Sequence, residues 1–313
     1  MPTPRVSAAE FVEGFNALGP EKLAAHLGTT ARAVFRRRRI LEAKGHILTP
    51  PRDRAKAVVA SRPQRAELNV ADGVVLVASD AHYWPGEPSL MHRALVAFCK
   101  RLKPRAVIFN GDVIDAPTIS RHPQIGWEKR PQLVDEIEAA KERLHEIEIA
   151  AFRAEKIWNL GNHDLRFETR LAAVAPEYAK INGVHLKDHF PLWRPAWATW
   201  INDQVVVKHR FKGGIHATHN NTLWSGKTMV TGHLHSAKVT PFSDYNGTRY
   251  GVDGGCIADT EAKAFVDYTE DNPKNWRSAF CVLTFKGGLL LQPELVVGWD
   301  SDCVQFRGEV IAP

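Results

Sequence analysis

Apolar runs that end abruptly in polar residues recur through the middle of this 313-residue chain, and they constrain its fold more than any other feature. The runs occupy residues 74–78, 106–109, 157–160, 204–208 and 229–231. A stretch of helical character follows the first run through Leu95 and Phe98, and a longer one spans residues 131–153 with apolar residues at helical spacing. The repeated order of strand, polar loop and helix predicts an α/β domain whose site gathers at the carboxyl ends of the strands.

Each apolar run is followed by residue types that bind metal ions. In chain order these are Asp80 and His82, Asp112 and Asp115, Asn162, His163 and Asp164, His209, and finally His233 and His235. A single histidine at a strand end is more often a structural residue than a ligand. Five such groups in series, each after an apolar run, are hard to obtain by chance and predict a metal site.

The ordered series resembles the motif set of the calcineurin-like metallophosphoesterases, over about residues 74–255. The resemblance implies a four-layer α/β/β/α sandwich with two metal ions at one edge. It assigns Asp80, His82 and His235 to one metal, Asn162, His209 and His233 to the other, and Asp112 as the bridge between them. It also implies that His163 donates a proton to the leaving group.

Elementary chemistry agrees with this assignment. A phosphoester is an anion that repels a hydroxide nucleophile, and two cations held about 3.5–4 Å apart clamp the phosphoryl oxygens and acidify a bridging water. Histidine, carboxylate and amide ligands without a thiolate favour Mn²⁺, with Fe, Zn²⁺ and Mg²⁺ as alternatives. A histidine suits the role of His163 because its pKa lies near working pH.

The supporting residues leave alternatives open. Asp164 would orient His163 and keep it protonated, or would cap a helix, and Asp115 is expected to be structural rather than a ligand. In the fourth motif we expect His209 to be the ligand because it directly follows a strand, with His216 as the alternative. We consider substrate contact for three further residues, Arg166, His216 and His219. For Arg166 the alternative is that its side chain lies on a solvated helix face.

Residues 20–44 form a separate module that resembles a helix-turn-helix. Gly28 is expected to end one helix, and Thr29 or Thr30 to cap a second that runs through Val34 and Ile40. Arg37 stands where the helix-turn-helix pattern usually has an apolar residue. The second helix carries the arginines expected to bind nucleic acid phosphates: Arg32, Arg36, Arg37, Arg38 and Arg39. The alternative is a small helical bundle with a solvated basic face.

Charge separates the two parts of the chain. Residues 1–70 hold thirteen Lys/Arg and six Asp/Glu, a net charge of +7, whereas the remaining 28 Lys/Arg and 29 Asp/Glu give −1. A basic module on a near-neutral body indicates a polyanionic partner. No apolar run approaches the length of a membrane span and the first residues do not resemble a signal peptide, so we expect a cytoplasmic protein with four reduced cysteines. The oligomeric state is left open.

The sequence therefore predicts a basic helix-turn-helix-like module at 1–48, a linker at 49–73 and a metallophosphoesterase domain at 74–313. The function it favours is a binuclear-metal phosphodiesterase or nuclease acting on nucleic acid, in an arrangement that also resembles phosphoesterases of phages and prophages. One alternative is a phosphatase or small-molecule phosphodiesterase, including a cyclic-nucleotide one, whose N-terminal module binds a protein. Another is a DNA-binding regulator with an inactive phosphoesterase domain, which the complete ligand set disfavours.

Overall fold

The computed structural model describes residues 6–48, 64–121, 127, 129–262, 265, 269, 272 and 274–313. Its chain divides into two compact units, Met1–Arg62 and Pro63–Pro313. Most of the predicted linker, residues 49–63, lies outside the described residues. The prediction that the linker extends to residue 73 is wrong, because strand β1 (Arg65–Leu68) pairs with the second unit. Only Ala66 and Leu68 are buried on this short strand, and the charged Arg65 and Glu67 alternate with them, so the strand carries no continuous apolar run.

The described part of the N-terminal unit, residues 6–48, contains two helices around a small apolar core. Helix α1 (Ala8–His26) is kinked at Gly19, and helix α2 (Ala31–Glu42) follows a short turn. Gly28 has the predicted left-handed backbone, and the Thr30 side chain caps α2 by accepting the Ala33 N–H. The core contains Phe11, Phe15, Leu23, Ala24, Val34, Leu41 and Leu48.

The described part of the second unit contains two β-sheets. The larger has nine strands in the order β15-β14-β13-β11-β2-β3-β4-β5, with β12 beside β11, and the smaller has six in the order β1-β6-β7-β8-β10-β9. Strands β2, β3, β4 and β5 run parallel, as do β7, β8 and β10. Their bounds are β2 Gly73–Ala78, β3 Ala106–Asn110, β4 Glu155–Asn159, β5 Arg194–Ala196, β6 Ala198–Ile201, β7 Val205–Val207, β8 Thr228–Thr231, β9 Lys238–Asp244, β10 Gly247–Asp253, β11 Ala279–Lys286, β12 Leu289–Leu290, β13 Glu294–Gly298, β14 Val304–Phe306 and β15 Glu309–Ile311.

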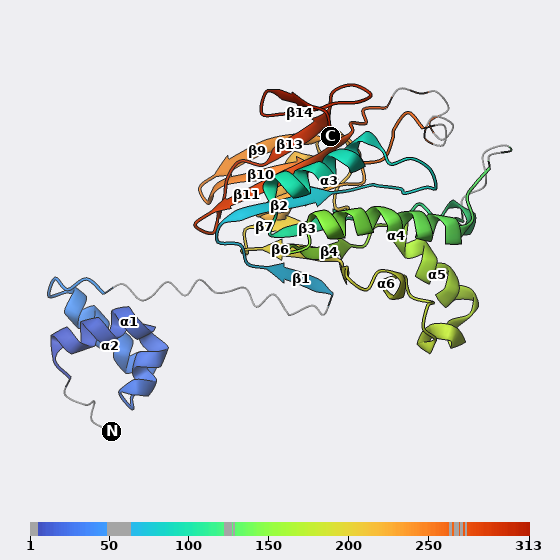
Figure 1. Ribbon diagram of the computed structural model, residues 1–313. Coiled ribbons are helices and arrows are strands. Elements are labelled where there is room, and N and C mark those ends of the chain that lie inside the picture. The colour runs from blue at the N-terminus through green and yellow to red at the C-terminus, as the bar shows by residue number, and fades with distance from the viewer. Residues whose placement is uncertain are drawn as a thin grey trace. The chain divides into compact units, whose positions relative to one another are not determined.

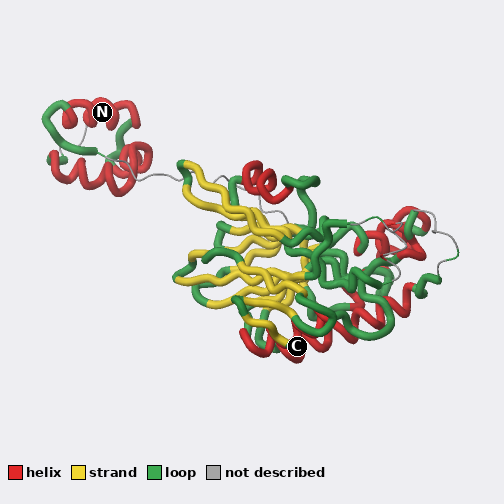
Figure 2. The backbone as a smooth tube through the Cα atoms, turned by 90° about the horizontal axis from the view of Figure 1, so that it is seen from above, coloured by secondary structure: helices red, strands yellow, loops and turns green. Residues whose placement is uncertain are grey.

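Helices cover the outer faces of both sheets, which gives the predicted four-layer α/β/β/α order. Helices α3 (Leu90–Leu102) and α4 (Leu133–Ala150) pack side by side on the larger sheet (Figure 1). Helix α7 (Ala217–Ser225) packs on β8, β9 and β10. The strands form the yellow centre of the unit in Figure 2. Further helical segments among the described residues are α5 (Asp164–Val174), α6 (Leu186–His189) and the short 3-10 turns Pro117–Ile119 and Pro176–Lys180.

Two apolar clusters hold these layers together. One lies between the sheets and includes Val75, Ile108 and Val230, and the other lies between the larger sheet and its helices and includes Leu95, Phe109 and Leu144. Strands buried on both faces explain why the sequence shows continuous apolar runs instead of alternation. Among the described residues, no helix combines the length and apolar character needed to cross a membrane.

Candidate metal centre

The polar loops after β2, β3, β4, β7 and β8 converge at one edge of the two sheets. Close approach between the loops demands glycine at two positions. A Cβ atom at Gly161 would collide with the Asp112 carboxylate, and one at Gly232 would collide with Ser79 and the Asp80 carboxylate. The series of strand ends predicted from the sequence therefore does form one cluster.

Left-handed backbone is concentrated in this cluster. The non-glycine residues of the cluster with positive φ are Asp80, His82, Asp112, His233 and His235, with values between 42° and 70°. Such conformations cost roughly 1–3 kcal/mol each and persist where the surroundings enforce them, often at functional sites. The fold therefore accepts strain in order to aim these five side chains.

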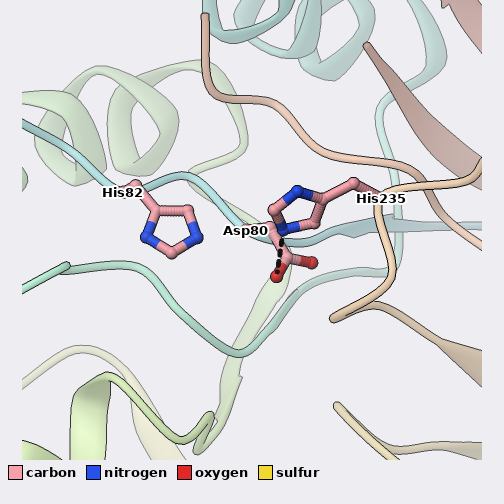
Figure 3. A group of neighbouring side chains, drawn as sticks. All are labelled: Asp80, His82 and His235. Atoms are coloured by element: carbon pink, nitrogen blue, oxygen red, sulfur yellow. Dashed lines mark hydrogen bonds and ion pairs between the residues drawn. The ribbon is translucent and has the colours of Figure 1, made fainter. Parts of the chain in front are cut away.

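Asp80, His82 and His235 form the first group of candidate ligands (Figure 3). Their ligand atoms lie within 4.8 Å of one another, and all three residues are buried. His235 Nε2 is 3.0 Å from Asp80 Oδ1, while the other carboxylate oxygen of Asp80 accepts the His233 N–H at 2.9 Å. The Asp80 side chain thus also fixes the loop that carries both histidines.

Asp112, His209 and His233 form the second group, also within 4.8 Å. His209 donates from Nδ1 to the Asn110 carbonyl oxygen at 2.7 Å, which leaves Nε2 3.1 Å from Asp112 Oδ2. A histidine whose outer nitrogen is fixed in this way presents the other nitrogen to a cation. Asn162 lines the same cavity as Asp112 and His233.

The donor atoms fit a divalent cation. The buried side-chain atoms without a hydrogen-bond partner include both ring nitrogens of His82, Asn162 Oδ1, His209 Nε2 and His235 Nδ1. Buried polar atoms are normally satisfied, so these ring nitrogens and the amide oxygen, gathered beside two carboxylates in one cluster, fit a cationic partner. The three groups of His and Asp that could hold a metal, within the described ranges, all lie here.

Electrostatics in the cluster agree with this fit. Burial alone would raise the pKa of Asp80, but the His235, His209 and His82 rings hold it well below its usual value. Burial alone would lower the pKa of His209, but the Asp80 and Asp112 carboxylates raise it to about 9. The buried carboxylates therefore draw positive charge to the site, which a divalent cation would also supply.

The orienting partner of His163 differs from the one predicted. His163 Nδ1 lies 2.5 Å from Asp115 Oδ1, so Asp115 and not Asp164 holds the imidazole. Asp164 instead accepts N–H groups of Asp112, Val113, Ile114, Gly161 and Trp158. Adjacency in sequence misled the prediction, because Asp164 turns inward to join the loops after β3 and β4. Asp164 is the first residue of α5, and the N-cap position before it is His163.

Arg166 completes the surroundings of His163. Its guanidinium donates to the Asp115 carbonyl oxygen at 2.8 Å and lies 3.3 Å from His163 Nε2, and it lines the cavity. Burial would lower the pKa of His163, but the Asp115 hydrogen bond and the Asp112 charge raise it. His163 is thereby favoured in its protonated form.

The two histidines predicted to contact substrate, His216 and His219, lie outside the cluster. His216 precedes α7 and is exposed, and the His219 ring packs edge-on against Phe242, 5.4 Å between centroids. Neither lines the cavity or joins a candidate metal group within the described residues. The geometry therefore favours His209 over His216 as the fourth-motif ligand.

A cavity of about 530 Å³ opens over the cluster. Besides the predicted residues it is lined by side chains that the sequence motifs do not contain: Tyr83, Trp84, Arg130, Arg143, Phe265 and Trp276. Some of these are remote from the motifs in sequence, and no spacing rule singles any of them out.

Comparison with known proteins gives limited further information. No family model matches the chain. Gene 54 protein of Mycobacterium phage D29 is 24% identical over 245 residues, covering 71% of this chain and 92% of that protein. Similar solved structures include zinc-complexed Vps29 from Entamoeba histolytica (12% identity, 77% of this chain and 97% of that one, TM-score 0.39) and an archaeal phosphodiesterase (15%, 72% and 99%, TM-score 0.38). Another is the phosphoesterase YfcE from E. coli (13% identity, 70% and 97%, TM-score 0.32).

Proposed function

We propose that this protein is a metal-dependent phosphoester hydrolase of the calcineurin-like type, acting on phosphodiesters of nucleic acid. The observation that carries the proposal is the convergence of ligand atoms without a hydrogen-bond partner from His82, Asn162, His209 and His235. They gather in a cluster where five residues have left-handed backbone. Asp80, His82 and His235 would hold one cation and Asn162, His209 and His233 the other, with Asp112 between them. When bound, two cations supply charge neutralisation of the phosphoryl group and acidify water, and Mn²⁺ suits the donor set.

The protein's own residues supply the proton chemistry. His163 presents Nε2 toward the cavity because Nδ1 is engaged by Asp115, so it is placed to protonate a leaving oxygen. Arg166 adds a positive charge beside His163 and would contact the substrate phosphate once the anion enters. Asp164 keeps the loop geometry through its backbone contacts and takes no part in proton transfer.

The preference for nucleic acid rests on the N-terminal unit. On α2, Arg32, Arg36 and Arg39 are exposed on one helical face. Arg37 is turned toward the unit's own core, donating to the Val6 carbonyl oxygen and lying 4.8 Å from the Phe11 ring centroid. This explains how an arginine occupies a normally apolar position, since its guanidinium stacks over the Phe11 ring.

Arg38 is also engaged within the unit, where it pairs with Glu42 at 2.7 Å. The face proposed to contact phosphates is therefore narrower than the arginine run. The two-unit arrangement is also consistent with a phage-type phosphoesterase, as is the phage origin of the curated relative.

A small phosphodiester such as a cyclic nucleotide is the second candidate substrate. The cavity favours it, because about 530 Å³ lies within the range of small-ligand sites and would admit a single nucleotide unit more readily than a duplex. Under this alternative the N-terminal unit binds another protein.

One set of assays separates these possibilities. The Mn²⁺-loaded chain is tested on bis-p-nitrophenyl phosphate, p-nitrophenyl phosphate, cyclic AMP and labelled single- and double-stranded DNA. We expect hydrolysis of the diester and of DNA, and a chain lacking residues 1–62 should keep the first while losing DNA affinity. The deletion ends at residue 62 because β1 belongs to the second unit. Hydrolysis of small esters with DNA left intact would favour the second candidate, and no hydrolysis of any ester would refute the enzyme proposal.

A further inference from the structure

Two aromatic side chains outside the motifs pack directly on the first ligand group. The Phe265 ring lies edge-on to His82, with centroids 5.5 Å apart, and Trp276 lies edge-on to His235 at 4.9 Å. The two aromatic rings also contact each other at 5.8 Å. They therefore form a continuous wall that rises from the His82–His235 side of the site into the cavity.

Backbone hydrogen bonds hold Trp276 in place. The next residue, Arg277, donates its N–H to the His235 carbonyl oxygen at 2.6 Å and accepts the Cys256 N–H at 3.1 Å. Trp276 itself is half-buried and lines the cavity. A large, flat side chain is thus presented to the cavity in a fixed position beside the candidate metal centre.

The cavity is lined by groups of two chemical kinds. His163 and Arg166 provide positive and proton-donating groups suited to a phosphate, whereas Phe265 and Trp276 provide flat apolar surface. A nucleotide has the same division, with an anionic phosphate one sugar away from a planar base. Stacking of a base on an aromatic side chain contributes to binding whatever the base sequence.

We infer that Trp276, supported by Phe265, is the platform on which the base of the nucleotide adjoining the scissile phosphate stacks. The inference rests on the proposed function and narrows it to substrates that place a nucleobase within one nucleotide of the reacting phosphate. Trp84 also lines the cavity, but among the described residues its ring makes no aromatic contact with the ligand histidines. Trp276 is the tryptophan whose position is tied to the site.

The test compares two ligands that differ only in the base. These are phosphonate analogues of AMP and of ribose 5-phosphate, whose carbon–phosphorus bond cannot be hydrolysed. Their binding to the full-length Mn²⁺-loaded chain is measured by calorimetry for wild type, Trp276→Ala, Trp276→Phe and Trp299→Ala. Trp299 is an exposed tryptophan that does not line the cavity and serves as the matched control.

We expect wild type and Trp299→Ala to bind the AMP analogue roughly 10- to 100-fold more tightly than the ribose analogue. Trp276→Ala should bring this ratio close to one without changing the affinity for the ribose analogue or the Mn²⁺ content, and Trp276→Phe should keep most of the preference. An unchanged ratio in Trp276→Ala would overturn the inference. Equal weakening of both ligands with loss of Mn²⁺ would also overturn it, because Trp276 would then only support His235. Failure of the proposed function is recognised separately, as absence of hydrolysis by the wild type.

Discussion

Replacing Asp115 with asparagine tests the proton-donating arrangement most sharply. The Asp115 carboxylate lies 2.5 Å from His163 Nδ1, and Arg166 lies 3.5 Å from the same carboxylate oxygen. Asparagine keeps the size of the side chain and removes the negative charge. His163 then keeps an oxygen that can accept from Nδ1, but it loses the negative charge that favours its protonated form.

The size of the effect follows from the hydrogen bond that is weakened. A hydrogen bond to a charged group is worth about 1.5–3 kcal/mol, which corresponds to a loss in kcat of roughly 10- to 100-fold. Complete removal of the donor in His163→Ala sets the upper limit, roughly 10²–10⁴-fold. Asp115→Asn should therefore fall between wild type and His163→Ala, with Mn²⁺ content unchanged.

The assay uses two diesters with different leaving groups. Loss of a p-nitrophenolate needs little protonation, whereas loss of a nucleoside alkoxide needs a proton donor, so the variant should be much more impaired on a dinucleotide than on bis-p-nitrophenyl phosphate. Asp259→Asn is the control, because it removes an exposed carboxylate that lines the same cavity. Equal losses on both substrates, or loss of bound Mn²⁺, would show that Asp115 acts on the metal site and not through His163.

Two further predictions concern parts outside the centre. Replacing Arg32, Arg36 and Arg39 together by alanine should reduce the slope of log affinity for DNA against log salt by about 2 to 3. Arg37→Ala should instead lower the stability of the N-terminal unit. Equal slopes in the triple variant and wild type would refute the phosphate-binding face. Burial raises the pKa of Glu136 from 4.5 to about 7, so ionisation should destabilise the metal-free fold progressively between those pH values, by about 3 kcal/mol in total. Glu136→Gln should remove this loss of stability. Denaturant curves with the same pH dependence in both proteins would contradict the prediction.

The sequence was most informative where strands are buried on both faces. Residues 74–78 and 106–109 were recognisable because continuous apolar runs ended at Asp80 and Asn110. Strands that are only partly buried, such as β9 and β13, carry no such run and were not predicted. Strand β11 was also not predicted, although most of it is buried. Charged residues likewise concealed β1, so the boundary of the second unit was placed too late.

Candidate ligands could be predicted because each follows its strand directly. Contacts between side chains that are distant in sequence could not be predicted. Whether Asp115 or Asp164 holds His163 depends on how the loops after β3 and β4 turn toward each other. Trp276 is one of nine tryptophans in the chain, and only the tertiary structure separates it from the others. The sequence also could not show that Arg37 turns inward while Arg36 faces solvent.

The number of divalent ions bound per chain tests the central claim most directly. Elemental analysis after dialysis against Mn²⁺ should find two ions in the wild type and a loss at both sites in Asp112→Ala, because one carboxylate is proposed to lie between both cations. Asp164→Asn serves as a comparison that removes a neighbouring buried carboxylate outside the proposed ligand set. Finding no tightly bound ion in the wild type, or two ions retained in Asp112→Ala, would contradict the account.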